Sequence, residues 1–177
     1  MFSLLVASRA SDLEHGKVYQ ASFTDVEGRQ FALGDGHAML LTVATRETET
    51  NAHLVGHNVP DEFIGHPHYR CVTIINFQNK IPSLLRGIIT AAVRHVFRAE
   101  ADAVQPRYSA KKIEHSPRAD LYAIADFDGT IVHQLDIDPA SNDLAVFVFD
   151  GHGNLVRQWH DVPSSEELRV ALEAARS

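Results

Sequence analysis

The sequence predicts a single α/β domain, in which helices flank a mixed β-sheet and an N-terminal β-hairpin precedes it. The chain has 177 residues, a length that suits one domain with a real core. Apolar, β-rich segments alternate with helical patterns, which predicts parallel strands joined by helices. Two adjacent strand patterns and a helix close the chain and add antiparallel strands. No linker or repeat interrupts residues 1–177, so one domain is expected, with residues 1–17 as an N-terminal extension.

The strand patterns begin with the hairpin. Residues 18–23 and 30–33 flank Glu27-Gly28, which is a turn signal. Residues 38–45 (AMLLTVAT) form a mostly apolar run, typical of a strand buried on both faces. Residues 69–77 (YRCVTIINF) are rich in β-branched side chains, which favour a second buried strand.

Two later segments share one theme. LYAIADFDGTIV and LAVFVFDGHGNLV, which begin at Leu121 and Leu144, each run apolar strand, Asp, Gly, apolar strand. In the second segment, residues 150–154 (DGHGN) predict the turn of a β-hairpin. The expected order is therefore a hairpin, then β-α-β-α-β, then an antiparallel hairpin and a final helix.

The clearest helix is expected over residues 82–104, with Pro82 at its start and Pro106 just beyond its end. Its apolar residues have the spacing of one buried helical face: Leu84, Leu85, Ile88, Ile89, Ala92, Val93, Val96 and Phe97. We expect the side with Leu85, Ile89, Val93 and Val96 to contact the sheet. The remainder, with Leu84, Ile88 and Phe97, is available to a second subunit.

Two other helices are expected. A short one starts near Thr50, in the polar stretch after the first buried strand. The last follows Ser164, where Glu167 three residues later completes a capping box. Its predicted buried stripe is Leu168, Ala171, Leu172 and Ala175.

Composition narrows the function classes. The formal net charge is -7, so a nucleic-acid partner has no global electrostatic support and none is expected. Between residues 86 and 118 seven bases outnumber three acids, a local surplus that favours a solvated helix face over a partner surface. No stretch approaches the roughly 20 apolar residues of a membrane span, so no membrane partner is expected.

Cysteine content bears on the compartment. Cys71 is the single cysteine, so no internal disulfide forms, and a free thiol suits a reducing compartment. We therefore expect a cytoplasmic protein from the sequence as given. A chain from which an export signal had been trimmed would look the same.

Three segments resemble the thioredoxin-like superfamily. DLAVFVFDGHGNLVRQWHDVPSSEELRVALEAA is similar to its closing hairpin and final helix. ASFTDVEGRQFALGDGHAMLLTVAT is similar to the opening hairpin and first core strand of its peroxiredoxin and membrane-tethered thioredoxin branches. HYRCVTIINFQNKIP resembles an uncharacterised bacterial branch whose second core strand carries a similar Thr-Ile-Ile-Asn. The resemblance spans residues 18–175 and implies a thioredoxin-like fold.

The resemblance also implies where redox chemistry would stand. Redox members carry a cysteine just after the first core strand, where the following helix N-terminus stabilises its thiolate. Here that place is residues 45–50 (TRETET), which contain neither cysteine nor serine. The cis-proline that usually precedes the closing hairpin is missing too, because Pro139 lies too far upstream and Asn142 or Asp143 takes its place. The chain is therefore identified as a member of a branch that lacks the Cys-X-X-Cys motif.

We interpret the chain as a redox-inactive thioredoxin-fold protein, a binding or protein-interaction module that needs no cofactor. The sequence contains no complete catalytic constellation. The expected site is the ledge where redox members have their active site, with Arg46, Glu47 and Thr48 facing Ser141 and Asn142. The expected partner is an unidentified protein or small molecule, and a homodimer is possible.

Two enzymatic alternatives stay open. His53 and His57 are four residues apart, and His66 and His68 lie nearby in sequence; imidazoles at such spacings bind zinc or nickel. No cysteine or clear carboxylate completes that set, so surface histidines are the simpler interpretation. Cys71 would serve a thiol enzyme only if exposed, and within an apolar strand it is expected to be a core thiol.

A third alternative is a phosphatase. Residues 126–130 (DFDGT) resemble the nucleophile loop of the haloacid dehalogenase superfamily, in which the first Asp attacks phosphorus and the second handles a proton. Such enzymes also need a lysine and a further acidic pair, and the chain after Asp126 contains no lysine. Turn chemistry explains the segment, since Asp bonds the local backbone and Gly accepts positive φ. A phosphatase is the least favoured interpretation.

Overall fold

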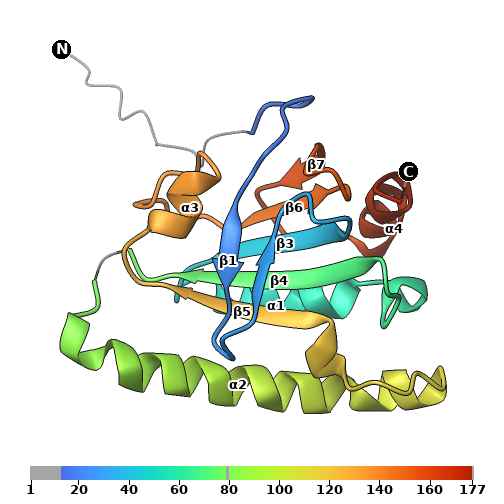
Figure 1. The fold of residues 1–177 in the computed structure, drawn as a ribbon, viewed down its shortest axis with the longest axis horizontal. Helices are drawn as coiled ribbons and strands as arrows, with labels where there is room; N and C mark the ends of the chain where they lie inside the picture. Colours follow the sequence, from blue (N-terminus) through green and yellow to red (C-terminus); the bar gives the residue numbers. More distant parts are fainter. Residues whose placement is uncertain (1–12, 79, 177) are drawn as a thin grey trace.

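A five-stranded mixed sheet forms the centre of the protein (Figure 1). The structure is a computed structural model that describes residues 13–78 and 80–176. The strand order is β5-β4-β3-β6-β7. β3 (Ala38–Ala44), β4 (Tyr69–Asn76) and β5 (Leu121–Asp126) are parallel. β6 (Ala145–Phe149) pairs antiparallel with β3, and β7 (Leu155–Trp159) pairs antiparallel with β6. This is the mixed α/β fold that the sequence predicts.

The N-terminal hairpin is present but shorter than expected. β1 (Ser22–Thr24) and β2 (Gln30–Ala32) pair antiparallel in a separate two-stranded sheet. Gly28 takes a φ of 86° at the turn, a left-handed conformation that favours glycine. The expected start at residue 18 is wrong, because Val18 forms an isolated antiparallel bridge with Asn154 beside β7.

The predicted N-terminal extension falls partly outside the described residues, which begin at Leu13. That leucine is buried. The Gln158 side chain on β7 accepts from Leu13 N at 2.8 Å and donates to Leu13 O at 3.4 Å. Residues 13–17 are therefore tied to the β7 edge of the sheet.

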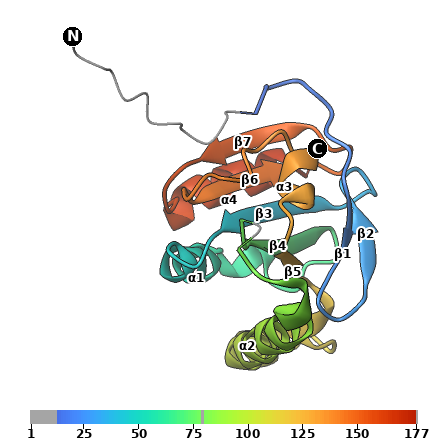
Figure 2. The same ribbon diagram turned by 90° about the vertical axis from the view of Figure 1, so that its left-hand side faces the viewer.

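The two faces of the sheet carry separate cores. All seven residues of β3 are buried, as the apolar run predicts. Its odd-numbered side, with Met39, Leu41 and Val43, packs under the hairpin and α3 (Thr130–Gln134). The other face is covered by α1 (Glu49–Asn58) and α4 (Ser165–Ala174), which Figure 2 shows on the side opposite the hairpin. Two 3-10 helices, η1 (Asp61–Phe63) and η2 (Pro117–Ala119), precede β4 and β5.

The predicted details of α4 are confirmed. The Ser164 side chain accepts from Glu167 N at 3.3 Å, and the Glu167 carboxylate accepts from Ser164 N at 2.9 Å, which completes the capping box. The expected stripe of Leu168, Ala171, Leu172 and Ala175 is buried.

The long helix α2 (Ser83–Ala110) continues beyond its expected end. We expected Pro106 to lie just past the helix, but Pro106 is inside it. Tertiary contacts hold the last turn in place of the missing backbone donor. Tyr108 is buried and donates to Asp120 Oδ2 at 2.7 Å, and Arg107 Nε donates to Asp61 Oδ1 at 2.8 Å.

No helix in the described part of the chain is long and apolar enough to cross a membrane.

The expected buried face of α2 is half right, because Ile89 and Val93 are partly buried but the other two expected residues are exposed. The helix lies along the β5 edge of the sheet, so only a narrow line of it meets the core. That line contains Val93, Phe97, Ala101 and Tyr108. Leu85 and Val96, which we expected against the sheet, are each 45% exposed. Phe97, which we assigned to the free side, is buried against Val26 and Ala123.

One expected strand is a helix. The apolar residues after Asp126-Phe127-Asp128-Gly129 form α3 rather than a second strand. The Asp126 carboxylate accepts the backbone N–H of Ile131 at 2.9 Å and of Val132 at 3.0 Å. These bonds satisfy donors in the first helical turn, which stabilises a helix over a strand at this position.

Candidate functional site

The predicted site segments lie at one edge of the sheet. β3 and β4 are parallel and pair Ala44 with Ile75, so Thr45 and Asn76 follow at the same level. The antiparallel register of Val43 with Ala145 brings the loop before β6 to that edge as well. Ligands of open α/β sheets commonly bind beyond the carboxyl ends of the parallel strands. We call this region the carboxyl-edge ledge and define it as residues 45–48, Gln78, Lys80 and residues 139–142.

Residues 45–48 form a tight turn ahead of α1. Thr45 N donates to Thr48 Oγ1 at 2.9 Å, and Thr48 N donates to Thr45 O at 3.2 Å. Thr45 is buried, whereas Arg46 and Glu47 are exposed. The Glu47 backbone N–H and the Thr45 hydroxyl lower the pKa of the Glu47 carboxyl, with smaller contributions from the charges of Lys80 and Arg46. The turn therefore presents a cation and an ionised carboxylate to solvent.

The loop across the ledge is fastened by the end of β4. Asn76, which is buried, donates from Nδ2 to Pro139 O at 2.9 Å. Gln78 N donates to Asn76 Oδ1 at 2.9 Å. Gln78 has a φ of 53°, which is uncommon for a residue other than glycine.

The Gln78 amide then spans the loop. Its Nε2 donates to Ser141 O at 2.9 Å and to Asn142 Oδ1 at 2.7 Å. Its Oε1 accepts from Lys80 Nζ. Gln78 thus links the loop to a lysine whose charge also acts on Glu47.

Asn76, Gln78 and Lys80 were not among the residues predicted at this ledge. The available signal was an amide directly after a buried strand, within the Thr-Ile-Ile-Asn segment. Of the residues that were predicted, Asn142 is exposed. The Ser141 hydroxyl accepts from Asp143 N at 3.2 Å, so it stabilises its own turn. The ledge offers exposed charges and amides for noncovalent contacts.

An aromatic pair lies beside the ledge. Phe77 follows β4 and Phe127 follows β5, and their rings stack with centroids 5.0 Å apart at 17°. The Arg86 guanidinium lies 5.4 Å from the Phe127 centroid. It also pairs with Asp128 at 2.5 Å and 2.8 Å, and this hydrogen bonding lowers the pKa of the Asp128 carboxyl.

The DFDGT segment has a structural role at the start of α3. Asp126 is only 2% exposed and its Oδ2 serves the two amides of α3. Gly129 has a φ of 72°, and a Cβ there would lie 2.5 Å from Pro139 Cβ. Asp128 is paired with Arg86. This geometry fits the expected turn chemistry and gives a phosphatase neither an accessible nucleophile nor a free second carboxylate.

The candidate metal-ligating histidines stay in separate pairs. On α1, His53 Nδ1 lies 2.5 Å from Glu100 Oε1 of α2. His66 and His68 stack near the start of β4, with centroids 5.4 Å apart. Desolvation, followed by the charge of Arg176, lowers the pKa of His66. Across residues 13–78 and 80–176, no group of three or more His, Cys, Asp or Glu side chains is arranged to hold a metal ion.

Cys71 lies in β4, near the strand's amino end. Part of the residue reaches the surface, but its thiol is desolvated strongly enough to raise the pKa to about 12, with the Asp120 charge adding to the shift. At neutral pH this thiol is almost entirely protonated, and the protonated form is a poor nucleophile. The expectation of a core thiol agrees with this environment.

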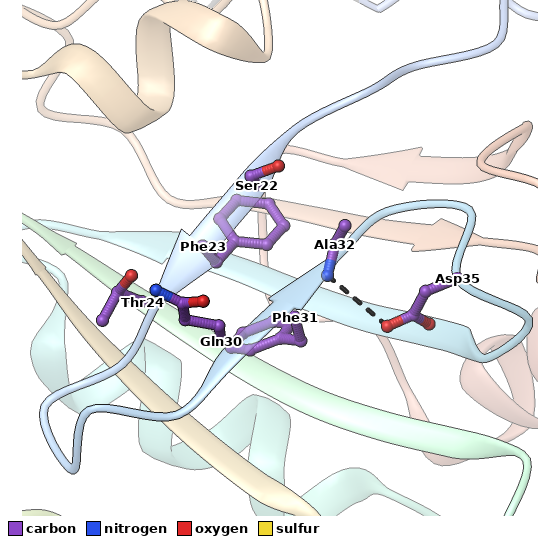
Figure 3. Close-up of a pocket in the computed structure, with 7 residues that line it drawn as sticks. All are labelled: Ser22, Phe23, Thr24, Gln30, Phe31, Ala32 and Asp35. Carbon is purple, nitrogen blue, oxygen red and sulfur yellow. Dashed lines mark hydrogen bonds between the residues drawn. The ribbon is translucent and has the colours of Figure 1, made fainter.

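A shallow hollow lies elsewhere, on the outer side of the hairpin (Figure 3). Phe23 and Phe31 in its lining are buried, so the surface it presents comes from Ser22, Thr24 and Gln30. Asp35 at its rim is already bonded to Arg70 and to His37. The hollow offers few uncommitted polar groups, so the carboxyl-edge ledge is the stronger candidate.

The strand order, the β-α-β crossovers and the closing hairpin with its helix define a thioredoxin fold. No protein-family model matches the chain, and no curated protein sequence matches it significantly. Solved structures do match. A putative thiol:disulfide interchange protein, DsbE, from Chlorobium tepidum aligns with a TM-score of 0.56 and 10% identity, over 93% of this chain and 99% of that one.

Two further structures agree. A DsbF homologue from Corynebacterium diphtheriae aligns with a TM-score of 0.53 and 13% identity, over 98% of this chain and 97% of that one. The exposed lipoprotein thioredoxin Etrx1 from Streptococcus pneumoniae aligns with a TM-score of 0.52 and 12% identity, over 87% and 98%. These likenesses confirm the thioredoxin-like fold.

Proposed function

We propose that this chain is a thioredoxin-fold binding module that works without thiol–disulfide exchange, and that its ligand binds at the carboxyl-edge ledge. The observation that carries the proposal is the position of Cys71, the only cysteine. The ledge begins after Asn76, five residues along β4, which is about 16 Å at the rise of a strand. A thiol at that distance, with its pKa raised to about 12, is poorly suited to exchange at the ledge.

The name of the similar structure from Chlorobium tepidum describes thiol:disulfide interchange, a reaction that requires a reactive cysteine. In this chain residues 45–50 supply threonine, arginine and glutamate in its place. The ledge combines two cations, Arg46 and Lys80, with the anion Glu47, beside a loop that Gln78 holds in place. Preorganised charges and amides of this kind suit a polar ligand, such as a peptide segment or a small carboxylate.

The redox part of the proposal is tested with insulin disulfides and dithiothreitol, and separately with hydrogen peroxide. We expect no turnover above the uncatalysed rate in either assay. Turnover that disappears in Cys71→Ser would identify a thiol enzyme and overturn the proposal. Turnover that requires added zinc or nickel and is lost in His66→Ala would support a metal enzyme instead.

The binding part is tested by nuclear magnetic resonance on the isotope-labelled chain. The probes are a set of short peptides and small carboxylates. We expect amide shifts to cluster at residues 45–48, Gln78 and residues 139–142, and to weaken in Arg46→Ala and Lys80→Ala. Arg157→Ala on β7 serves as the matched control and should leave the shifts unchanged. Shifts confined to another surface would assign the ligand site elsewhere.

A further inference from the structure

The outward side of α2 is an apolar surface that no other described segment covers. Leu84 is 89% exposed and Ile88 is 68% exposed. Single exposed leucines are common on soluble proteins, but a contiguous apolar patch marks an interaction surface. Positions three and four residues apart share one side of a helix, which joins these residues into a stripe. We call it the α2 stripe: Leu84, Leu85, Ile88, Ala92, Val96, Ala99 and Ala103.

The position of α2 leaves this side accessible. Figures 1 and 2 both show the helix along the lower rim of the molecule, with the rest of the chain above it. Its inward side is anchored by Phe97, Ala101 and Tyr108. Another molecule can therefore approach the α2 stripe along its whole length without meeting the sheet or the hairpin.

The order of side-chain sizes along the stripe suits a second copy of the same helix. The bulky residues Leu84, Leu85 and Ile88 lie in the first turns, and Ala99 and Ala103 lie in later turns. A two-fold axis perpendicular to the helix reverses this order in the partner, so Leu84 would meet Ala103 and Ile88 would meet Ala99. Two-fold interfaces require such self-complementary patches. We propose that a second copy of this chain covers the α2 stripe, with the two α2 helices antiparallel.

The area is sufficient for a small dimer interface. The four large side chains of the stripe, together with its exposed alanines and the neighbouring Ala91 and His95, expose roughly 600–700 Å² per protomer. Pairing two copies would bury about 1,200–1,400 Å², at the lower end of stable protein–protein interfaces. A dimer of modest affinity follows.

The charges beside the stripe do not oppose pairing. Arg86 pairs with Asp128, Arg98 with Glu27 and Arg118 with Asp102, all within one chain. These three arginines therefore already have acidic partners. In this register Asp102 of one copy lies opposite Leu85 of the other, and the ion pair of Asp102 with Arg118 balances its charge there.

The first test is the molar mass by light scattering and sedimentation over roughly 1–200 μM, the range in which an interface of this size should dissociate. We expect the mass to rise from 19.6 kDa toward twice that value. Ile88→Glu should weaken association at least tenfold with an unchanged circular dichroism spectrum. Ile88→Ala gives a second variant without a charge, expected to weaken association less. The matched control is Val170→Glu, a similarly exposed apolar position on α4, which should leave the dimer intact.

The second test fixes the orientation. Ile88→Cys combined with Ala99→Cys should cross-link two chains under mild oxidation, because these positions face each other across the two-fold axis. Within one helix they are about 16 Å apart, too far for a disulfide. Leu84→Cys alone should not cross-link, since its two copies would lie about 28 Å apart. A monomer at every concentration, a dimer that survives Ile88→Glu, or efficient cross-linking of Leu84→Cys would each overturn the proposal.

Discussion

Asp126→Ala is expected to destabilise the protein strongly, because one carboxylate oxygen serves two backbone donors. Asp126 is nearly fully buried, and its Oδ2 lies 2.9 Å from Ile131 N and 3.0 Å from Val132 N. A hydrogen bond to a charged acceptor contributes about 1.5–3 kcal/mol, and an unsatisfied buried donor costs about 1–3 kcal/mol. Because the two bonds share one acceptor and are not additive, we expect a loss of about 3–4 kcal/mol.

The packing of α3 supports this magnitude. Val132 on that helix and Leu135 directly after it are fully buried beneath the hairpin, so loosening the first turn disturbs the core. Asp126→Asn keeps an oxygen acceptor and should lose only about 1 kcal/mol. Asp128→Ala is the control, since it removes a solvent-exposed ion pair with Arg86 and should change stability little.

Thermal and urea denaturation measure the differences. In a chain of this size 1 kcal/mol shifts Tm by about 2–4 °C, so Asp126→Ala should lower Tm by about 6–16 °C. Equal shifts for Asp126→Ala and Asp128→Ala would refute the capping role. Magnesium-dependent phosphatase activity that vanishes in Asp126→Asn would show that the carboxylate acts as a nucleophile after all.

Three further outcomes are expected. Cys71 should not react with a thiol reagent at pH 8 in the native protein, because burial raises its pKa to about 12. The same thiol should react fully in denaturant. A rapid reaction in the native protein would contradict the assignment of Cys71 to the core. Ser164→Ala should lower Tm by about 2–4 °C at pH 7. Hydrogen bonds from Ser164 lower the pKa of the Glu167 carboxyl below its usual value of 4.5. The stability that these bonds add is therefore present above that pH and is lost as the pH falls through the lowered pKa. The Tm deficit of Ser164→Ala should accordingly shrink in acid, and a deficit that stays constant with pH would contradict this reasoning. Phe97→Asp should be insoluble, whereas the half-exposed Val96→Asp should fold, and circular dichroism of the two proteins decides whether this orientation of α2 is right.

Elements whose signals are local were predictable from the sequence. The mostly apolar run of β3, the glycine turn of the hairpin and the Ser164–Glu167 capping box each depend on neighbouring residues. The α2 stripe could not be oriented in this way. Periodicity states which residues share a helical side, but not that a helix at a sheet edge buries only the line through Phe97 and Tyr108.

The candidate site likewise combines a part with a local sequence signal and a part that depends on contacts between distant residues. Residues 46–48 were selected because the resemblance places the active site of redox members just after the first core strand, and that strand has a strong local signal. The hydrogen bonds from Asn76 to Pro139 and from Gln78 to Ser141 each join residues 63 positions apart, so no local sequence pattern predicts them. The end of α2 was misplaced for a similar reason, since the buried Tyr108 and its bond to Asp120 outweigh the missing donor of Pro106.

The position of β3 at the centre of the sheet has a consequence for synthesis on the ribosome. β3 pairs on one side with β4, which follows soon after it, and on the other with β6, where Leu41 meets Phe147. These partners are about 100 residues apart, and at roughly 5–20 residues per second the nascent chain needs on the order of 5–20 s to supply the second one. During that interval one edge of a mostly apolar strand has no hydrogen-bonding partner, and such an edge is a template for aggregation. The emerging chain is therefore expected to depend on chaperones until its closing hairpin leaves the exit tunnel.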